Sequence, residues 1–240
     1  MTPDECCLKV HSAIRRHVGN TVKYGPFADM VMPPHGNRFY YVLGTYELEL
    51  HPILHRIGAL CFKTIVNVGA CDGYYAIGLA RSHPEARVVA FEAKDTAQGY
   101  LRLIAEANHV EDRIEIRGKC LLGNLADSVG DGEDCLVVMD CEGDENVLLN
   151  PGAVPALRNC HILAELHENE HEGIVKNIWD RFHGSHAITG AMSHPRRFNE
   201  LPFQPEASDS TEELIPYWIS TLEENRPIDM TWYYMEPTKC

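Results

Sequence analysis

The sequence predicts an α/β fold in which a mostly parallel sheet is covered by helices on both faces. From residue 63 onward, short apolar segments alternate with segments of helical periodicity, and this alternation is typical of parallel sheets. The apolar segments contain few polar residues, as expected for strands that are covered on both sides. A turn at 69–73, with glycine at both ends, directly follows the first of them. A strand, a tight turn and a helix in this order form the unit at whose carboxyl end such sheets bind ligands.

Seven strands follow from this pattern, at 64–69, 86–93, 113–118, 135–140, 161–166, 186–192 and 229–236. The predicted helices of the same region are 73–82, 94–108, 171–182 and 211–224. The last two strands lie on either side of a helix, which favours an antiparallel edge strand on the mostly parallel sheet. Residues 202–212 are rich in proline and acidic residues and predict a loop.

The first 60 residues have a different pattern. They predict helices at 4–18 and 47–60, a short strand at 39–42, and a loop at 24–36 where Gly and Pro interrupt regular structure. We therefore expect two domains, an N-terminal extension at 1–60 and a Rossmann-like α/β domain at 61–240. The aromatic residues of the extension fit either a lid over a binding site or ordinary packing; they are Tyr24, Phe27, Tyr40, Tyr41 and Tyr46.

Composition and charge argue against several classes of partner. The apolar content of 45% and the charged content of 23% are ordinary for a soluble globular protein. The formal net charge is −14 and no basic stripe is present, so we expect no nucleic acid as partner. No apolar run is long enough to span a membrane, and the acidic, polar N-terminus does not resemble a signal peptide. The nine cysteines form no C-x-x-C pair, which favours a reduced, cytoplasmic setting.

The stretch Asn67-Val68-Gly69-Ala70-Cys71-Asp72-Gly73-Tyr74 predicts a nucleoside site. Its glycines let the backbone turn sharply beside a ligand, and the helix that follows presents free N–H groups to the same crevice. Glu92 ends the next predicted strand, where an acidic side chain can accept both ribose hydroxyls. The second and third glycines of the dinucleotide fingerprint G-x-G-x-x-G are missing, and Asp72 is unfavourable beside a pyrophosphate. An amino group or a sulfonium suits Asp72 better, which favours S-adenosylmethionine over NAD.

Five segments in order resemble S-adenosylmethionine-dependent methyltransferases, and within them the FkbM-like group: GTYELEL (44–50), VNVGACDGYYAIGLA (66–80), VVAFEA (88–93), MDCEGDENVLLNPG (139–152) and ILAELHE (162–168). The resemblance implies a Rossmann-like class I methyltransferase fold with the sheet order 3-2-1-4-5. It also implies that Gly69, Ala70 and Asp72 contact the methionine end. The family usually has an acid where this chain has Asn67, and the missing charge predicts a lower cofactor affinity.

The predicted cofactor-binding residues are Asn67, Gly69, Ala70, Asp72, Gly73, Tyr74, Glu92, Cys120 and Asp140. Cys120 is a candidate adenine contact because methyltransferases of this fold commonly contact adenine from the loop after the third strand. A thiol that faces the core is an equally good interpretation of Cys120.

The fourth and fifth strands place a second group of side chains at the same edge of the sheet. Asp140 ends the fourth predicted strand, and Glu165 and His167 share one face of the fifth strand and its extension. Three roles remain open. His167 can act as a general base, Asp140 with Glu165 or His167 can hold Mg²⁺ or Mn²⁺, or the acids can bind a cationic substrate and orient it. Asp144 and Glu145 fit a structural role at a helix start.

His167-Glu168-Asn169-Glu170-His171 matches the zinc pattern H-E-x-x-H, but the segment crosses a strand end and offers no third ligand, so we do not expect zinc. We expect a methyltransferase that acts on a hydroxyl, or an amine, of a small-molecule or sugar-like acceptor. A non-catalytic cofactor-binding protein is the alternative that Asn67 suggests. A nicotinamide oxidoreductase is disfavoured by the missing glycines.

Overall fold

The computed structural model describes residues 1–32, 38–224 and 230–238. Part of the predicted loop at 24–36, residues 33–36, lies outside the described residues, as does residue 229 of the last predicted strand. Contacts between Cα atoms divide the chain into two compact units. Unit 1 consists of residues 1–51 and 194–228, and unit 2 of residues 52–193 and 229–240.

Unit 2 contains a seven-stranded sheet with the order β3-β2-β1-β4-β5-β7-β6. The strands are β1 (Thr64–Val68), β2 (Arg87–Phe91), β3 (Ile114–Arg117), β4 (Cys135–Met139), β5 (His161–Leu166), β6 (His186–Met192) and β7 (Thr231–Pro237). The first five pair in parallel, and β7 pairs antiparallel with both β5 and β6. The predicted fold class is therefore confirmed, with the antiparallel strand at the β6 end of the sheet.

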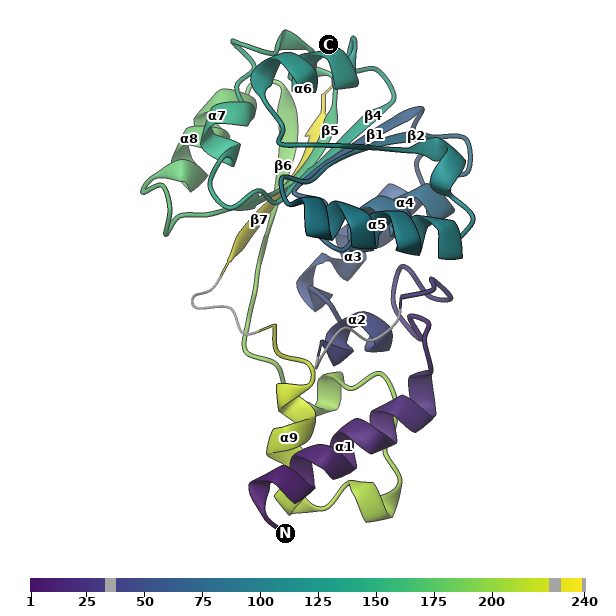
Figure 1. The fold of residues 1–240 in the computed structure, drawn as a ribbon. Helices are drawn as coiled ribbons and strands as arrows, with labels where there is room; N and C mark the ends of the chain where they lie inside the picture. Colours follow the sequence, from purple (N-terminus) through teal and green to yellow (C-terminus); the bar gives the residue numbers. More distant parts are fainter. Residues whose placement is uncertain (33–37, 225–229, 239–240) are drawn as a thin grey trace. The chain divides into compact units, whose positions relative to one another are not determined.

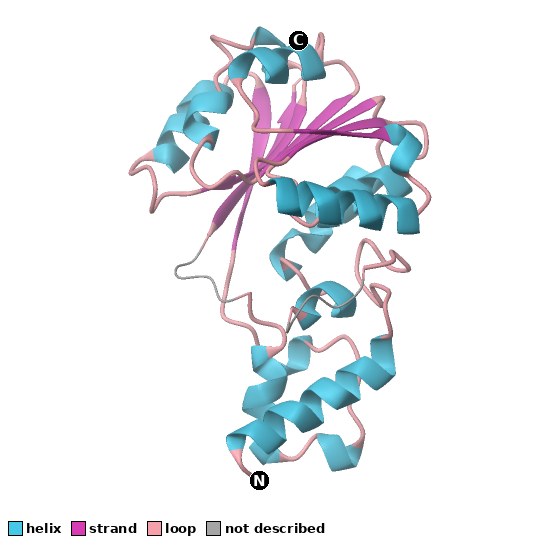
Figure 2. Cartoon of the chain, viewed as in Figure 1, coloured by secondary structure: helices cyan, strands magenta, loops and turns pink. Residues whose placement is uncertain are grey.

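Helices cover both faces of this sheet (Figures 1 and 2). They are α3 (His51–Gly58), α4 (Tyr74–Ser82), α5 (Asp95–Ala107), α6 (Leu122–Val129), α7 (Glu145–Leu148) and α8 (Ile174–Phe182). Side chains of α6, α7 and α8 pack with one face of the sheet in a buried cluster that includes Leu125, Leu148 and Ile178. Asn67 and Glu165 alternate with strand residues of that cluster, so they point to the other face.

Unit 1 is built around α1 (Pro3–Val18), α2 (Phe39–Leu43) and α9 (Ile215–Ser220). Thr2 and Glu5 form a capping box at the start of α1. The buried stripe of α1 shares a cluster with residues of α2 and the α9 region: Cys6, Val10, Ile14, Val18, Phe39, Val42, Leu43, Leu214, Trp218 and Leu222. Because Trp218 comes some 200 residues after α1 in the chain, two segments far apart in the sequence build one core.

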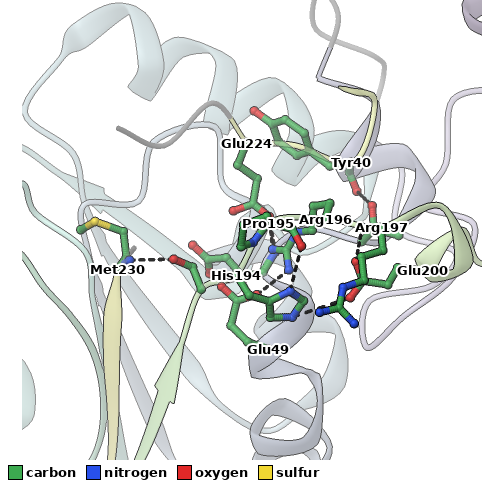
Figure 3. Close-up of polar contacts among 12 residues, drawn as sticks. Tyr40, Glu49, His194, Pro195, Arg196, Arg197, Glu200, Glu224 and Met230 are labelled. Atoms are coloured by element: carbon green, nitrogen blue, oxygen red, sulfur yellow. Dashed lines mark hydrogen bonds and ion pairs between the residues drawn. The ribbon is translucent and has the colours of Figure 1, made fainter. Parts of the chain in front are cut away.

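A buried ion-pair group also belongs to unit 1 (Figure 3). Nη1 of Arg196 lies 2.8 Å from Oε2 of Glu49, and Nη2 donates to Oε1 of Glu224 at 2.6 Å. All three side chains are at least 95% buried. A buried charge is costly unless it is paired, so each of these carboxylates needs the Arg196 guanidinium. Arg196 thereby connects the segment that carries Glu49 with the segment that carries Glu224.

Three predicted elements, within residues 39–60 and 211–224, were wrong. The predicted strand at 39–42 is helix α2, which ends at Gly44 in a left-handed conformation. In a short segment whose residues are all apolar, hydrophobic periodicity does not distinguish a helix from a strand. The predicted helix at 47–60 divides into a 3-10 turn (Leu48–Leu50) and α3, and that at 211–224 into a 3-10 turn (Glu212–Leu214) and α9. Pro52 and Pro216 occupy the first turn of α3 and α9, where a missing N–H costs nothing.

The division into units differs from the predicted domains. The boundary falls at residue 51 instead of 60, and residues 194–228 group with the N-terminal segment although the sequence placed them in the Rossmann-like domain.

Tyr40, Tyr41 and Tyr46 pack on one another with ring centroids 4.7–5.6 Å apart. The lid role of the extension stays a prediction. Among residues 1–32, 38–224 and 230–238, no helix combines the length and apolar character that crossing a membrane requires.

Candidate active site

The turn between β1 and α4 requires glycine at both ends. Gly69 has a φ of 79°, and a Cβ there would lie 1.6 Å from the carbonyl oxygen of Asp140. Gly73 has a φ of 90°, and a Cβ there would lie 2.2 Å from Cδ1 of Leu101. The left-handed φ at both positions disfavours any residue with a Cβ, and at Gly69 the added atom would also meet backbone, which cannot move aside as a side chain can. The turn after β1 therefore packs directly against the segment that follows β4.

Glu92 is fixed beside this turn. It follows β2, is 8% exposed, and accepts a hydrogen bond from the Cys71 N–H at Oε2 and from the Lys94 N–H at Oε1, both at 2.8 Å. Each carboxylate oxygen has a further lone pair. Two adjacent acceptors held in this way match a pair of vicinal hydroxyls.

Asp72 and Asn67 add further acceptor oxygens near the turn. Asp72 is 7% exposed, and its charge raises the pKa of Tyr100, which burial has already raised. Asn67 is buried in β1, where Nδ2 donates to the carbonyl of Val138 at 3.3 Å while Oδ1 is buried without a hydrogen-bond partner. A buried acceptor that is left unsatisfied calls for a donor. This set fits a ligand that carries hydroxyl and ammonium donors.

Among the other predicted cofactor residues, Ala70, Tyr74 and Cys120 are buried and Gly69 is partly exposed. The N–H groups of Gly69 and Ala70 both donate to the carbonyl of Phe91 at 2.9 Å, so these two amides are engaged within the fold. Tyr74 is 4% exposed and packs edge-on against Tyr75. Cys120 packs in the core cluster, and burial raises the pKa of its thiol to about 12. Its predicted adenine contact stays a prediction.

A second group of side chains meets at the ends of β4 and β5, as the sequence predicted. Asp140, Glu165 and His167 each offer one ligand atom, and these atoms lie within 4.8 Å of one another. Glu165 and His167 are buried, and the side chain of Asp140 is 27% exposed. Nε2 of His167 lies 3.6 Å from Oδ1 of Asp140 and 3.7 Å from Oε2 of the exposed Glu142. The cluster therefore combines one base with several acids.

Glu145 is the member of this site that the sequence interpretation missed. It begins α7, as a structural acid would, yet it is 0% exposed and its Oε1 lies 3.0 Å from Nδ1 of His167. Burial acts to lower the pKa of His167, but Glu145, Asp140 and Glu142 outweigh it and raise that pKa above its ordinary value. Asp144, by contrast, occupies the N-cap position without a capping bond and pairs with Lys119 at the surface.

The H-E-x-x-H pattern forms no metal site of the helical type. His167 is buried at the end of β5, whereas His171 is exposed in the following turn, where its N–H donates to the His167 carbonyl at 3.0 Å. Glu168 accepts hydrogen bonds from the N–H groups of Gly173 and Val175 at the start of α8. The pattern is explained by a turn and a helix cap.

The strand order, with its single antiparallel strand, defines the Rossmann-like fold of the class I methyltransferases. The solved structures that share it include a protein from Clostridium thermocellum provisionally assigned as an rRNA methylase. That protein has 12% identity and a TM-score of 0.51, with 78% of this chain and 96% of that chain covered.

Two O-methyltransferases align over more of the chain. One, from Bacillus cereus in complex with SAH, has 14% identity and a TM-score of 0.47, with 98% of this chain and 93% of that chain covered. The other is TomG from Streptomyces achromogenes in complex with SAM, which has 14% identity and a TM-score of 0.48, with 98% and 91% covered. The sequence matches no protein-family model and no curated protein sequence. At 12% identity, the similarity to the Clostridium thermocellum structure shows the fold alone.

Proposed function

We propose that this protein is an S-adenosylmethionine-dependent methyltransferase that acts on a hydroxyl or amine of a small-molecule acceptor. The observation that carries the proposal is the close packing of Gly69 against Asp140. This contact joins two groups of side chains at one edge of the sheet. One group offers acceptor oxygens to a nucleoside with an ammonium group, and the other presents a histidine among carboxylates.

In the cofactor half of the site, Glu92 would accept the two ribose hydroxyls, and Asp72 and Asn67 would accept hydrogen bonds from the ammonium group. The bound cofactor would supply an electrophilic methyl group on a sulfonium. The negative charges of Asp72 and Asp140 favour a cationic ligand and disfavour a pyrophosphate. This charge preference supports S-adenosylmethionine over a nicotinamide dinucleotide.

In the acceptor half, Nε2 of His167 would take the proton from the attacking hydroxyl or amine. A histidine whose pKa lies near the working pH is suited to this role, and general base catalysis contributes about 10²–10⁴-fold. Asp140 and Glu165 would orient the acceptor, because in-line approach controls much of the rate of such a transfer.

A second candidate mechanism uses a divalent cation. Asp140, Glu165 and His167 bring their ligand atoms within 4.8 Å of one another, and two carboxylates with one imidazole suit Mg²⁺ or Mn²⁺. The cation would lower the pKa of an acceptor hydroxyl. Methyl-transfer activity that requires added Mg²⁺ and is abolished by EDTA would favour this mechanism over a histidine base.

The acceptor class rests on charge. One protein with a similar fold is assigned to RNA, but the net charge of −14 and the acids around His167 would repel a phosphate backbone. We therefore propose a neutral or cationic small molecule, sugar-like hydroxyls included, in a cytoplasmic setting. The proposal also assigns the chain to the FkbM-like group of methyltransferases.

The decisive experiment is calorimetric titration of the protein with S-adenosylhomocysteine and, separately, with NADH, each with and without Mg²⁺. Binding of S-adenosylhomocysteine alone supports the proposal and leads to a radiolabelled methyl-transfer screen over phenols, sugars, amines and an RNA control. Cofactor binding without transfer to any acceptor would favour the non-catalytic alternative. Binding of NADH alone would favour the nicotinamide oxidoreductase and refute the proposal.

Two variants test the cofactor half. Asp72→Ala and Glu92→Ala should each weaken S-adenosylhomocysteine binding by about 1–3 kcal/mol, the cost of a lost charge-assisted contact. Asp144→Asn, which removes a surface acid near the same edge, is the matched control. Unchanged affinity in both test variants would contradict the site assignment. His167→Ala should lower turnover more than cofactor affinity, and equal loss of both would indicate a structural role.

A further inference from the structure

Glu145 is a buried carboxylate that faces the far end of the His167 ring. Its Oε1 lies 3.0 Å from Nδ1, whereas Nε2 on the opposite side of the ring faces Asp140 and the exposed Glu142. Nδ1 is itself buried and has no hydrogen-bond partner with regular geometry. A buried N–H normally finds an acceptor, and Glu145 is the carboxylate within reach. Catalytic contacts of this kind often align fully only when ligands bind.

The carboxylate of Glu145 is held from its own side as well. Oε1 accepts the N–H of Cys141 at 2.7 Å, and Oε2 accepts the N–H of Gly143 at 2.9 Å. The turn between them is unusual, since Glu142 and Gly143 have φ angles of 58° and 107°. Left-handed backbone at a residue other than glycine costs free energy, and such residues concentrate at functional sites. This turn brings the carboxylate back against the strand end.

Helix α7, which carries Glu145, is short but anchored by α8. Nη1 of Arg181 donates to the carbonyls of Asn146 at 2.6 Å and Leu149 at 3.0 Å, and Nη2 donates to Oδ1 of Asn146 at 3.1 Å. These bonds satisfy carbonyls at the end of a helix that has only four residues. The position of Glu145 is thus fixed by both ends of α7.

We infer that Glu145 is a positioning residue that keeps the neutral His167 ring with its proton on Nδ1, so that the Nε2 lone pair faces the acceptor. This inference rests on the proposed function. A proton that leaves the acceptor hydroxyl or amine binds to Nε2 and gives an imidazolium. Its Nδ1–H then faces the ionised Glu145, which stays deprotonated and balances the new charge. Its Nε2–H faces Asp140 and Glu142.

The first test reads the tautomer directly. The intact protein is labelled with ¹⁵N-histidine, and long-range ¹H–¹⁵N correlation spectra are recorded without cofactor at a pH that keeps His167 neutral. The His167→Asn variant assigns the signals. We expect the Nδ1–H form, which is the minor tautomer of free histidine, and in Glu145→Gln a shift toward Nε2–H. An Nε2–H form in the wild type, or an unchanged tautomer in Glu145→Gln, overturns the inference. This reading needs no methyl transfer, so it separates the inference from the proposed function.

The second test is kinetic. Glu145→Gln should lower kcat by about 10²–10⁴-fold, the contribution of a general base, while the Kd for S-adenosylhomocysteine stays within about 2-fold. Glu145→Asp, which keeps the charge, should recover part of the loss, and the surface control Asp144→Asn should behave as wild type. An equal loss of kcat and cofactor affinity would show that Glu145 is only structural. If Glu145→Gln fails to fold, the wild-type tautomer alone decides.

Discussion

Replacing Gly69 by alanine tests whether the turn after β1 is as tight as described. The added methyl group would meet a backbone oxygen, that of Asp140, at 1.6 Å, and a backbone atom cannot rotate away as a side chain can. The left-handed φ of 79° adds about 1–2 kcal/mol for any residue with a Cβ. Overpacking a tight contact typically adds about 1–3 kcal/mol. We therefore expect a loss of about 2–5 kcal/mol in the free energy of unfolding.

For a chain of this size such a loss corresponds to a fall in Tm of about 4–20 °C. Urea and thermal unfolding followed by circular dichroism measure it, and calorimetry should show that S-adenosylhomocysteine binding is lost as the turn shifts. Gly99→Ala is the matched control. Gly99 lies inside α5, and apart from its chain neighbours and the helix's own backbone no atom lies within 4 Å of an added Cβ, so alanine should stabilise the helix by about 1 kcal/mol. A Gly69→Ala protein as stable as wild type that still binds the cofactor would refute the reasoning.

Three further predictions concern the scaffold. Arg113 donates to the carbonyls of Ala80, His83 and Ala86, so Arg113→Ala should lower the free energy of unfolding by about 1–3 kcal/mol in urea titrations; an unchanged midpoint contradicts this. Arg196→Met leaves Glu49 and Glu224 buried without their cation and should cost about 3–5 kcal/mol, part of which Glu49→Gln should recover in the double variant. Burial lowers the pKa of His186 below its ordinary value of 6.5, so the unfolded chain binds more protons and stability is lost as the pH falls below 6.5. His186→Gln should reduce that loss, and equal pH slopes would contradict it.

The sheet could be predicted from the sequence because its strands are apolar runs bounded by clear turn residues. Cys135–Met139 is buried throughout, and His186–Met192 has the predicted bounds. The position of β7 between β5 and β6 was harder to predict from the sequence, since pairing order depends on contacts between residues far apart in the chain. The helix at Phe39–Leu43 was mistaken for a strand because all five of its residues are buried.

Part of the candidate site could also be predicted from the sequence, because it lies at the ends of predicted strands. Asp140 and His167 directly follow strands and Glu165 lies near the end of one, and parallel strands bring such ends together. Glu145 was assigned a structural role because an acid in the first turn of a helix is usually explained by the helix itself. Its approach to His167 depends on the left-handed turn at Glu142 and Gly143, which pattern analysis does not detect.

The shared core of unit 1 has a consequence for synthesis on the ribosome. The apolar stripe of α1, with Val10 and Ile14, is completed by Trp218 and Leu222, which emerge some 200 residues later. At about 5–20 residues per second, that stripe waits roughly 10–40 s for its partners. The strands β1 to β6 emerge during this interval. The nascent chain therefore carries an incompletely covered hydrophobic helix until residues 214–222 have emerged, and a chain that stops before residue 214 would leave it incompletely covered.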